Sequence, residues 1–214
     1  RISAETVDLL ISNNIFNQKQ LSTLTNTLSV LSSSSFPLQF MRVSEILKKF
    51  EAGSFQSVKT VFEKDPHSGI RLEPLKNDAI VNVNEDYLNL ALEELLINSA
   101  KYASPKSRIH IYSYQKDGFI FLSVKNSVNS EEEGVPEESE KLVIEPFYRL
   151  SKTAEDIYIE YDEKYSTGLG LCVVNYIVKK HYGLFWIKNH KDHFSSGSGI
   201  CTIAEIGLPI ERAA

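Results

Sequence analysis

Cysteine is scarce in this sequence. Only two of the 214 residues are cysteines, Cys172 and Cys201, and they lie far apart within apolar runs. We therefore expect two buried free thiols and no disulfide framework. Such thiols fit the reducing cytoplasm, which is where we expect this domain to work.

Long apolar runs are absent as well. No stretch approaches the about 20 uninterrupted apolar residues that a membrane helix needs, and no signal peptide opens the chain. The chain begins at Arg1 without a methionine, so we expect a piece of a longer protein. Any membrane anchor of the parent protein would lie in the missing part.

An excess of basic charge is also lacking. The 23 lysines and arginines are outnumbered by 28 aspartates and glutamates, which gives a net charge of −5. This balance argues against direct binding of nucleic acid. The apolar share of 42% is enough for one well-buried core and a small appendage.

The first 35 residues predict a separate helical unit. Residues 3–33 contain neither proline nor glycine, and one heptad seam carries Leu10, Leu21, Leu24, Leu28 and Leu31. This spacing is typical of a helix that packs along a partner helix in a hairpin or dimer. The alternative is an ordinary amphipathic helix packed on its own domain.

Residues 36–214 predict an α+β domain. Strand-like runs occupy 80–83, 109–114, 119–124, 184–188 and 200–206. Helical patterns occupy 85–102 and 170–181, and a shorter one, expected to be capped by Ser44, ends at Gly53. The turn signal Lys116-Asp117-Gly118 joins two strands into a hairpin. We expect a two-layer α/β sandwich, with a mixed, mainly antiparallel sheet covered by helices on one face.

The segment 126–167 is unusually acidic, and a single apolar island at 142–150 interrupts it. A polar stretch of this length inside a compact domain is usually either a mobile functional loop or a disordered one. The sequence leaves both readings open.

The helix predicted at 85–102 carries polar groups on one face. Glu94, Asn98 and Lys101 are spaced four and three residues apart, so they share a face beside an apolar one. A solvated stripe is one interpretation. The other is a magnesium and phosphate site, because Asn98 offers a hard carbonyl oxygen and Lys101 offsets phosphate charge.

Two glycines open the helix predicted from residue 170. They belong to the run Thr167-Gly168-Leu169-Gly170-Leu171. Glycines there let the backbone approach an anion closely, and the free amides and dipole of the helix start favour negative charge. The alternative is a simple flexible start of a helix.

The order of the segments resembles the catalytic domain of sensor histidine kinases. It runs E-x-x-x-N-x-x-K-Y at 94–102, E-P-F-Y-R at 145–149 and T-G-L-G-L at 167–171. These runs resemble the N box, the F box and the second glycine box of that family. The family belongs to the GHKL (Bergerat-fold) ATPases, shared with DNA gyrase, ninety-kilodalton heat-shock chaperones and mismatch-repair proteins. The resemblance covers about residues 36–210.

The resemblance implies ATP and Mg²⁺ as ligands, with Glu94 and Asn98 as the catalytic pair. Asn98 would hold the magnesium, and Glu94 would organise its water or act as a base. Lys101 and Tyr102 would contact phosphate and the sugar side of the nucleotide.

The resemblance also implies a lid over the nucleotide. Phe147 would anchor this lid, and Arg149 is a candidate for a phosphate or interdomain contact, with a plain surface arginine as the alternative. The lid helix would close on the phosphates through the second glycine box, which comprises Thr167, Gly168, Leu169, Gly170 and Leu171.

One box departs from the family pattern. The family has an aspartate that accepts a hydrogen bond from the adenine amino group, followed by Gly-x-Gly. Here Asn126 takes the place of the aspartate, and Ser127-Val128-Asn129 lacks both glycines. The oxygen of Asn126 can still accept, but the lost charge assistance would cost on the order of 1 kcal/mol. A degenerate regulatory module without ATP turnover is therefore the alternative function.

The five histidines do not match a phosphoacceptor. None lies on the predicted N-terminal helix, and none is followed by an acidic residue; they are His67, His110, His181, His190 and His193. We expect all five to be structural or exposed, and residues 1–35 to be the second helix of a dimerisation hairpin. The acceptor would then lie upstream of Arg1, on homodimeric helices that relay phosphate to the receiver domain of a response regulator.

Overall fold

The computed structural model describes most of residues 35–211 and a few positions before them. The described residues are 7, 18, 21, 25, 27–32, 35–53, 55, 69–104, 107–130, 134–150, 168–192 and 199–211. Several residues singled out above lie outside them, namely Leu10, Leu24, His67, Thr167 and His193. None of the helices within the described ranges is long and apolar enough to span a bilayer.

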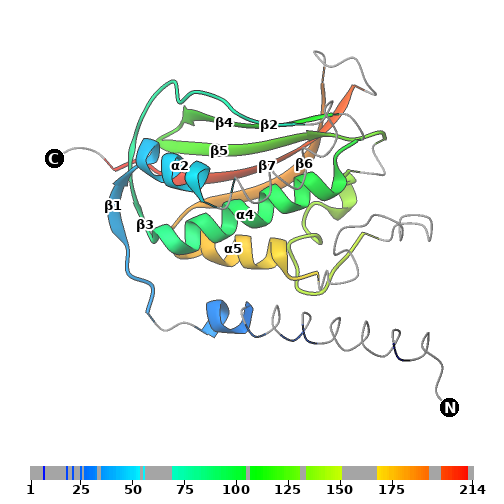
Figure 1. The fold of residues 1–214 in the computed structure, drawn as a ribbon, viewed down its shortest axis with the longest axis horizontal. Coiled ribbons are helices and arrows are strands. Elements are labelled where there is room, and N and C mark those ends of the chain that lie inside the picture. The colour runs from blue at the N-terminus through cyan, green and yellow to red at the C-terminus, as the bar shows by residue number, and fades with distance from the viewer. Residues whose placement is uncertain are drawn as a thin grey trace.

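A five-stranded sheet forms one layer of the domain (Figure 1). Its order is β2-β4-β5-β7-β6, and all neighbours are antiparallel except the parallel pair β2–β4. A two-stranded antiparallel sheet pairs β1 (Gln39–Arg42) with β3 (Ile80–Val83). The strands of the large sheet are β2 (Gly69–Leu72), β4 (Arg108–Lys116), β5 (Phe119–Ser127), β6 (Leu184–Lys191) and β7 (Ile200–Pro209).

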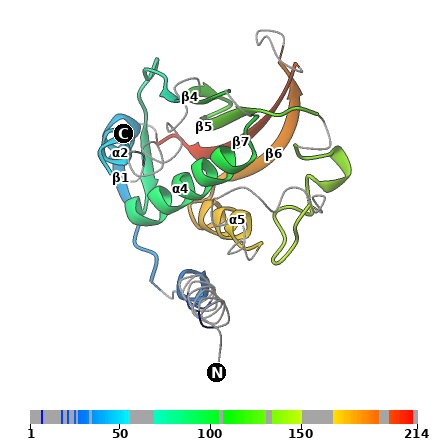
Figure 2. The same ribbon diagram turned by 45° about the vertical axis from the view of Figure 1, so that its right-hand side comes forward.

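Two helices form the second layer. α4 (Glu85–Tyr102) and α5 (Gly170–Lys180) cover one face of the sheet (Figures 1 and 2). The apolar face of α4 is buried as its sequence period predicts. Each fully buried leucine on it contributes about 2 kcal/mol to folding. The inward side chains of α4 are Leu88, Ala91, Leu92, Leu95, Leu96 and Ser99. This arrangement confirms the two-layer, mainly antiparallel α+β fold.

The start of the short helix α2 (Val43–Ala52) differs from the prediction. The helix begins one residue before Ser44, so Ser44 is not its N-cap. Instead Asp78, 34 residues away, accepts hydrogen bonds from the Ser44 amide at 3.0 Å and from its hydroxyl at 2.8 Å. A distant carboxylate thus satisfies the free amide of the first turn. The predicted end at Gly53 is correct, because its N–H caps the Lys49 carbonyl.

The sheet face opposite the helices buries a carboxylate. Glu205 on β7 is only 7% exposed and accepts hydrogen bonds from the Tyr114 hydroxyl (3.0 Å), the Ser123 hydroxyl (2.6 Å) and the Trp186 indole N–H (2.7 Å). Burial and the Glu205 charge raise the pKa of Tyr114. Three donors from three neighbouring strands therefore satisfy one acid, as burial of a charge requires.

The C-terminal end of α5 is tied to the start of α4 by a buried histidine. The Nε2 atom of His181 accepts the Asn84 N–H at 2.9 Å, and its Nδ1 lies 2.8 Å from the Ile177 carbonyl. This pattern requires the neutral ring with the proton on Nδ1. Asn84 also donates to the Pro37 carbonyl at 3.0 Å, and the Phe36 ring meets His181 edge-on at 4.9 Å. The segment after the N-terminal helix is therefore docked at this junction.

The stability of the fold should depend on the protonation of His181. Burial lowers the pKa of His181, so below the unfolded-state value of about 6.5 the unfolded chain binds a proton that the folded chain resists. The free energy of unfolding should therefore fall as the pH falls from about 7 to about 5. In denaturant unfolding, His181→Gln should flatten this slope, whereas His190→Gln, at an exposed site, should keep it. Equal slopes in wild type and His181→Gln would contradict the assignment.

The described end of the N-terminal segment is helical and contacts α5. Residues 27–32 are helical, and the Tyr176 hydroxyl donates to the Leu31 carbonyl at 3.0 Å. Leu21 and Leu28, two of the predicted seam leucines, are 63% and 61% exposed. These two leucines are therefore accessible to another helix, and the domain boundary near residue 35 stays a prediction.

Candidate functional site

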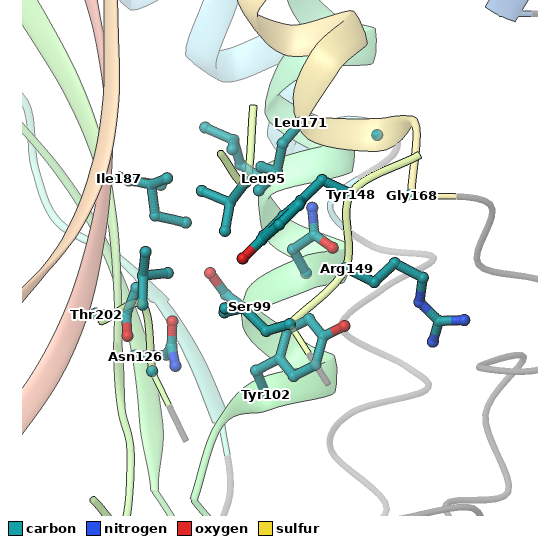
Figure 3. A pocket seen from close by; sticks show the side chains of 17 residues that line it. Leu95, Ser99, Tyr102, Asn126, Tyr148, Arg149, Gly168, Leu171, Ile187 and Thr202 are labelled. Carbon is teal, nitrogen blue, oxygen red and sulfur yellow. The ribbon is translucent and has the colours of Figure 1, made fainter. Parts of the chain in front are cut away.

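A cavity of about 110 Å³ lies between α4, the sheet and the start of α5 (Figure 3). This volume is of the order of the ~150 Å³ engineered cavity that takes up benzene. Seven of the residues that line it are apolar, namely Leu95, Val135, Val143, Leu150, Leu171, Ile187 and Ala204. Polar groups and glycines complete it, namely Asn98, Ser99, Tyr102, Asn126, Gly134, Tyr148, Arg149, Gly168, Gly170 and Thr202. Apolar walls with a few convergent polar groups are typical of a small-molecule site.

The inner end of the cavity is polar and neutral. Asn126, near the end of β5, is 4% exposed and lies beside Ser99 and Thr202 (Figure 3). Its amide nitrogen donates to the Ser127 carbonyl at 3.5 Å, which leaves the amide oxygen directed into the cavity (Figure 3). The Thr202 hydroxyl donates to Asn189 Oδ1 at 2.9 Å. The amide oxygen of Asn126 therefore offers a hydrogen-bond acceptor to the edge of a ring bound in the cavity.

Two side chains of α4 that bear oxygen atoms, Glu94 and Asn98, lie close to the start of α5. Asn98 lines the cavity, and Glu94 lies one turn earlier on α4, as the spacing predicts. A Cβ built on Gly170 would lie 2.5 Å from Glu94 Oε2 and 3.7 Å from Asn98 Nδ2. Only glycine lets the start of α5 come this close to both side chains. Burial raises the pKa of Glu94, and the charge of Glu93 raises it further.

The remaining predicted site residues differ in whether they reach the cavity. Tyr102 lines the cavity. Lys101 does not; its ammonium lies over the Tyr102 ring, 4.9 Å from the centroid. Leu169 is 4% exposed and is buried beneath the start of α5 without reaching the cavity. Arg149 lines the rim, but its guanidinium points away from the cavity (Figure 3).

Two residues with left-handed backbone lie at the wall opposite the sheet, and of these Gly168 lines the cavity. Gly168 has φ +70° and Phe147 has φ +64°, and the Phe147 N–H donates to the Gly168 carbonyl at 2.9 Å. A Cβ on Gly168 would lie 3.0 Å from the Tyr148 carbonyl oxygen. The Tyr148 ring projects into the cavity (Figure 3), whereas Phe147 is 68% exposed. The 147–149 segment is therefore in direct contact with the residue that precedes the start of α5.

A glycine missing from the prediction completes the wall. The residues directly after Asn126 lack glycine, but Gly134 lines the cavity after the acidic run Glu131-Glu132-Glu133. A Cβ there would collide with the Asn189 side chain, whose Oδ1 accepts the Val135 N–H at 2.9 Å. The two glycines of the family pattern are absent directly after Asn126, and Gly134, which the sequence analysis did not single out, lines this part of the cavity. In the sequence, the run Gly134-Val135-Pro136 could have indicated this glycine, but it directly follows three glutamates and was assigned to the acidic loop.

The residues present fit a magnesium-bound triphosphate. Asn98 and Glu94 offer hard oxygens, which magnesium prefers, and Gly170 leaves room at a helix start that attracts anions. Within the described ranges, no three His, Cys, Asp or Glu side chains gather as a metal cluster. A magnesium held by one or two side chains, water and substrate phosphates needs no such cluster.

Comparisons with known proteins identify the family of this domain. The family model of the histidine kinase-, DNA gyrase B-, and HSP90-like ATPase matches residues 83–211, more than half of the chain. The adaptive-response sensory kinase SasA of Microcystis aeruginosa is 28% identical over 166 residues, covering 78% of this chain and 38% of that protein. The heme sensor protein HssS of Staphylococcus epidermidis is 32% identical over 100 residues, covering 47% of this chain and 19% of that protein. The chain thus spans 19–38% of the length of these relatives.

Solved structures share the fold. The mycobacterial sensor histidine kinase MprB has a TM-score of 0.61 at 21% identity, covering 82% of this chain and 99% of that chain. Full-length ShkA in complex with AMPPNP has a TM-score of 0.65 at 14% identity, covering 100% of this chain and 41% of that chain. The chain belongs to the histidine kinase-, DNA gyrase B- and HSP90-like ATPase family and contains a catalytic ATP-binding domain of the sensor histidine kinase type.

Proposed function

We propose that this cavity binds ATP with Mg²⁺, with the base at Asn126 and the phosphates at Asn98 and the start of α5. The observation that carries the proposal is that one cavity is lined by Asn126, Asn98, Gly168 and Gly170 together. Its apolar walls suit a purine ring. The first-turn amides and the dipole of α5 suit a triphosphate.

The polar groups at the phosphate end would have separate tasks. Asn98 would hold Mg²⁺ through its amide oxygen, and the ion would offset the phosphate charge. The raised pKa of Glu94 brings its carboxylate closer to the working pH, where a base accepts protons most effectively. Lys101 lies one turn along the same face and would reach phosphate if its ammonium left the Tyr102 ring.

The parent protein would transfer the γ-phosphate to a histidine on its dimerisation helices and then to the receiver domain of a response regulator. Residues 1–35 would be the second helix of that dimerisation hairpin, which agrees with the exposed Leu21 and Leu28. The acceptor histidine would lie on the preceding helix. The domain would work in the cytoplasm, and a membrane anchor would belong to another part of the parent protein.

A regulatory module that keeps the fold without ATP turnover is the second candidate. The neutral Asn126 in place of an acidic acceptor favours it, because the neutral hydrogen bond is weaker. The two candidates differ in one outcome. A kinase domain phosphorylates a histidine-bearing dimerisation hairpin supplied in trans, whereas a regulatory module leaves it unlabelled.

Titration with a fluorescent ATP analogue tests nucleotide binding directly. We expect saturable binding that requires Mg²⁺ and is lost on chelation, because the metal and the start of α5 together offset the phosphate charge. We expect no autophosphorylation, because none of the five histidines matches an acceptor site. Binding that remains undetectable at millimolar ligand would contradict the proposal.

A further inference from the structure

The cavity holds one buried amide, on Asn126, whose position is set by the sheet. Asn126 pairs with Thr202 in the antiparallel register of β5 and β7, and only 4% of its surface is exposed. Its backbone cannot shift without breaking this ladder. A change in the group that Asn126 recognises must therefore come from rotation of its side-chain amide.

The surroundings of this amide are uncharged. Among the described residues that line the cavity, Arg149 alone carries a charge, and its guanidinium points outwards (Figure 3). Ser99 and Thr202 lie beside Asn126 (Figure 3); the Ser99 hydroxyl can donate or accept, whereas the Thr202 hydroxyl already donates to Asn189 and can only accept. No fixed charge at the inner end favours a donor over an acceptor on the bound base.

The amide is also weakly held. Its nitrogen donates to the Ser127 carbonyl at 3.5 Å, which is at the outer limit for a hydrogen bond. Rotating the amide by half a turn exchanges its oxygen and nitrogen, and this terminal torsion has broad, roughly two-fold wells. Among the described residues, the rotation breaks this one long hydrogen bond and turns the amide oxygen towards the Ser127 carbonyl.

The two orientations read two different purine edges. With the oxygen inward, Asn126 accepts from the 6-amino group of adenine. With the nitrogen inward, it donates to a 6-oxo group. A carboxylate has no donor, so it cannot donate to a 6-oxo group.

We propose that this site accepts 6-oxopurine nucleoside triphosphates as well as ATP, with Asn126 as the residue that determines this specificity. The inference rests on the proposed nucleotide binding and deepens it. On this inference, asparagine in place of aspartate at position 126 widens the range of nucleotides that bind, rather than only lowering the affinity for ATP.

Competition against the fluorescent ATP analogue with Mg²⁺ tests the inference, using ATP, ITP and GTP as competitors. For the wild type we expect ITP to bind within about tenfold of ATP, because each base makes the same number of hydrogen bonds to Asn126. Asn126→Asp should weaken ITP by about tenfold or more while tightening ATP. Asn126→Ala should weaken both nucleotides by similar factors, and it keeps the test decisive if the buried aspartate variant does not fold.

The outcomes separate the inference from the function beneath it. Wild-type binding of ATP with ITP more than about 100-fold weaker would overturn the inference and leave ATP binding intact. An Asn126→Ala variant that loses ATP alone would also overturn it. Failure of every nucleotide to bind would instead remove the proposed function. Binding of ITP with rejection of GTP would support the reading of the 6-position, with the 2-amino group excluded by the walls.

Discussion

Asn98→Ala is expected to abolish Mg²⁺-dependent nucleotide binding while leaving the fold intact. The variant removes the side-chain amide of Asn98, which lines the cavity from α4. Loss of a supporting group behind a metal ligand typically costs 10- to 100-fold in affinity, so loss of the ligand itself should cost more than about 100-fold. The helix should tolerate the change, because alanine has the highest helix propensity and Asn98 is only half-buried.

The same substitution elsewhere on α4 provides the matched control. Asn89 lies on α4 outside the cavity lining, and its buried Oδ1 has no hydrogen-bond partner among the described residues. Asn89→Ala should therefore keep both binding and thermal stability. Asn98→Asp retains an oxygen ligand and should restore part of the Mg²⁺ dependence. Unchanged affinity in Asn98→Ala would remove Asn98 from the site, and equal losses at Asn89 and Asn98 would indicate damage to the helix.

Elements defined by their own residues were predictable. The helix expected at 85–102 is observed as α4 over the same residues, because its apolar period meets the sheet and Asn84 caps its start by accepting the Tyr87 N–H at 3.1 Å. The strand expected at 80–83 is β3. Turn signal and strand alternation together placed the β4–β5 hairpin. In each case the deciding interactions span a few residues or a repeated period.

Elements defined by distant partners were not predictable. β2 is a short strand of four residues whose existence depends on parallel pairing with β4, and its sequence carries too few residues to show a period. Ser44 has the local character of an N-cap, but the carboxylate of Asp78 takes over that end of α2. A cap supplied through tertiary contact leaves no trace in local spacing.

The site divides along the same line. Glu94 and Asn98 share a helix, so their common face follows from geometry. Asn126 and Gly134 are brought together with α4 by the sheet and by packing on Asn189. The left-handed backbone of Phe147 is rare for a residue with a side chain and follows from its bond to Gly168. From the sequence alone, only the resemblance to a family pattern predicted that these residues belong to one site.

Gly168→Ala is expected to disrupt the side of the cavity lined by Tyr148, Arg149 and Gly168, and to weaken nucleotide binding. Gly168 has φ +70°, and an added Cβ would lie 3.0 Å from both the Phe147 carbonyl carbon and the Tyr148 carbonyl oxygen. The left-handed backbone alone costs an alanine about 1–2 kcal/mol. The contacts with the neighbouring backbone add to this cost, since backbone atoms cannot rotate away. Relief of the clash requires displacement of Tyr148, which projects into the cavity. A fall in affinity of about tenfold or more should result.

Gly118 offers the matched control for this strain. It has φ +81° in the β4–β5 turn, and an added Cβ would meet nothing within 4 Å. Gly118→Ala should therefore lower the melting temperature through backbone strain while leaving nucleotide affinity unchanged. The two variants should be compared by thermal unfolding and by titration with the fluorescent ATP analogue. Equal nucleotide affinities for Gly168→Ala and Gly118→Ala would show that this side of the cavity tolerates the displacement of Tyr148. The contact between the 147–149 segment and the start of α5 would then have no part in holding the nucleotide.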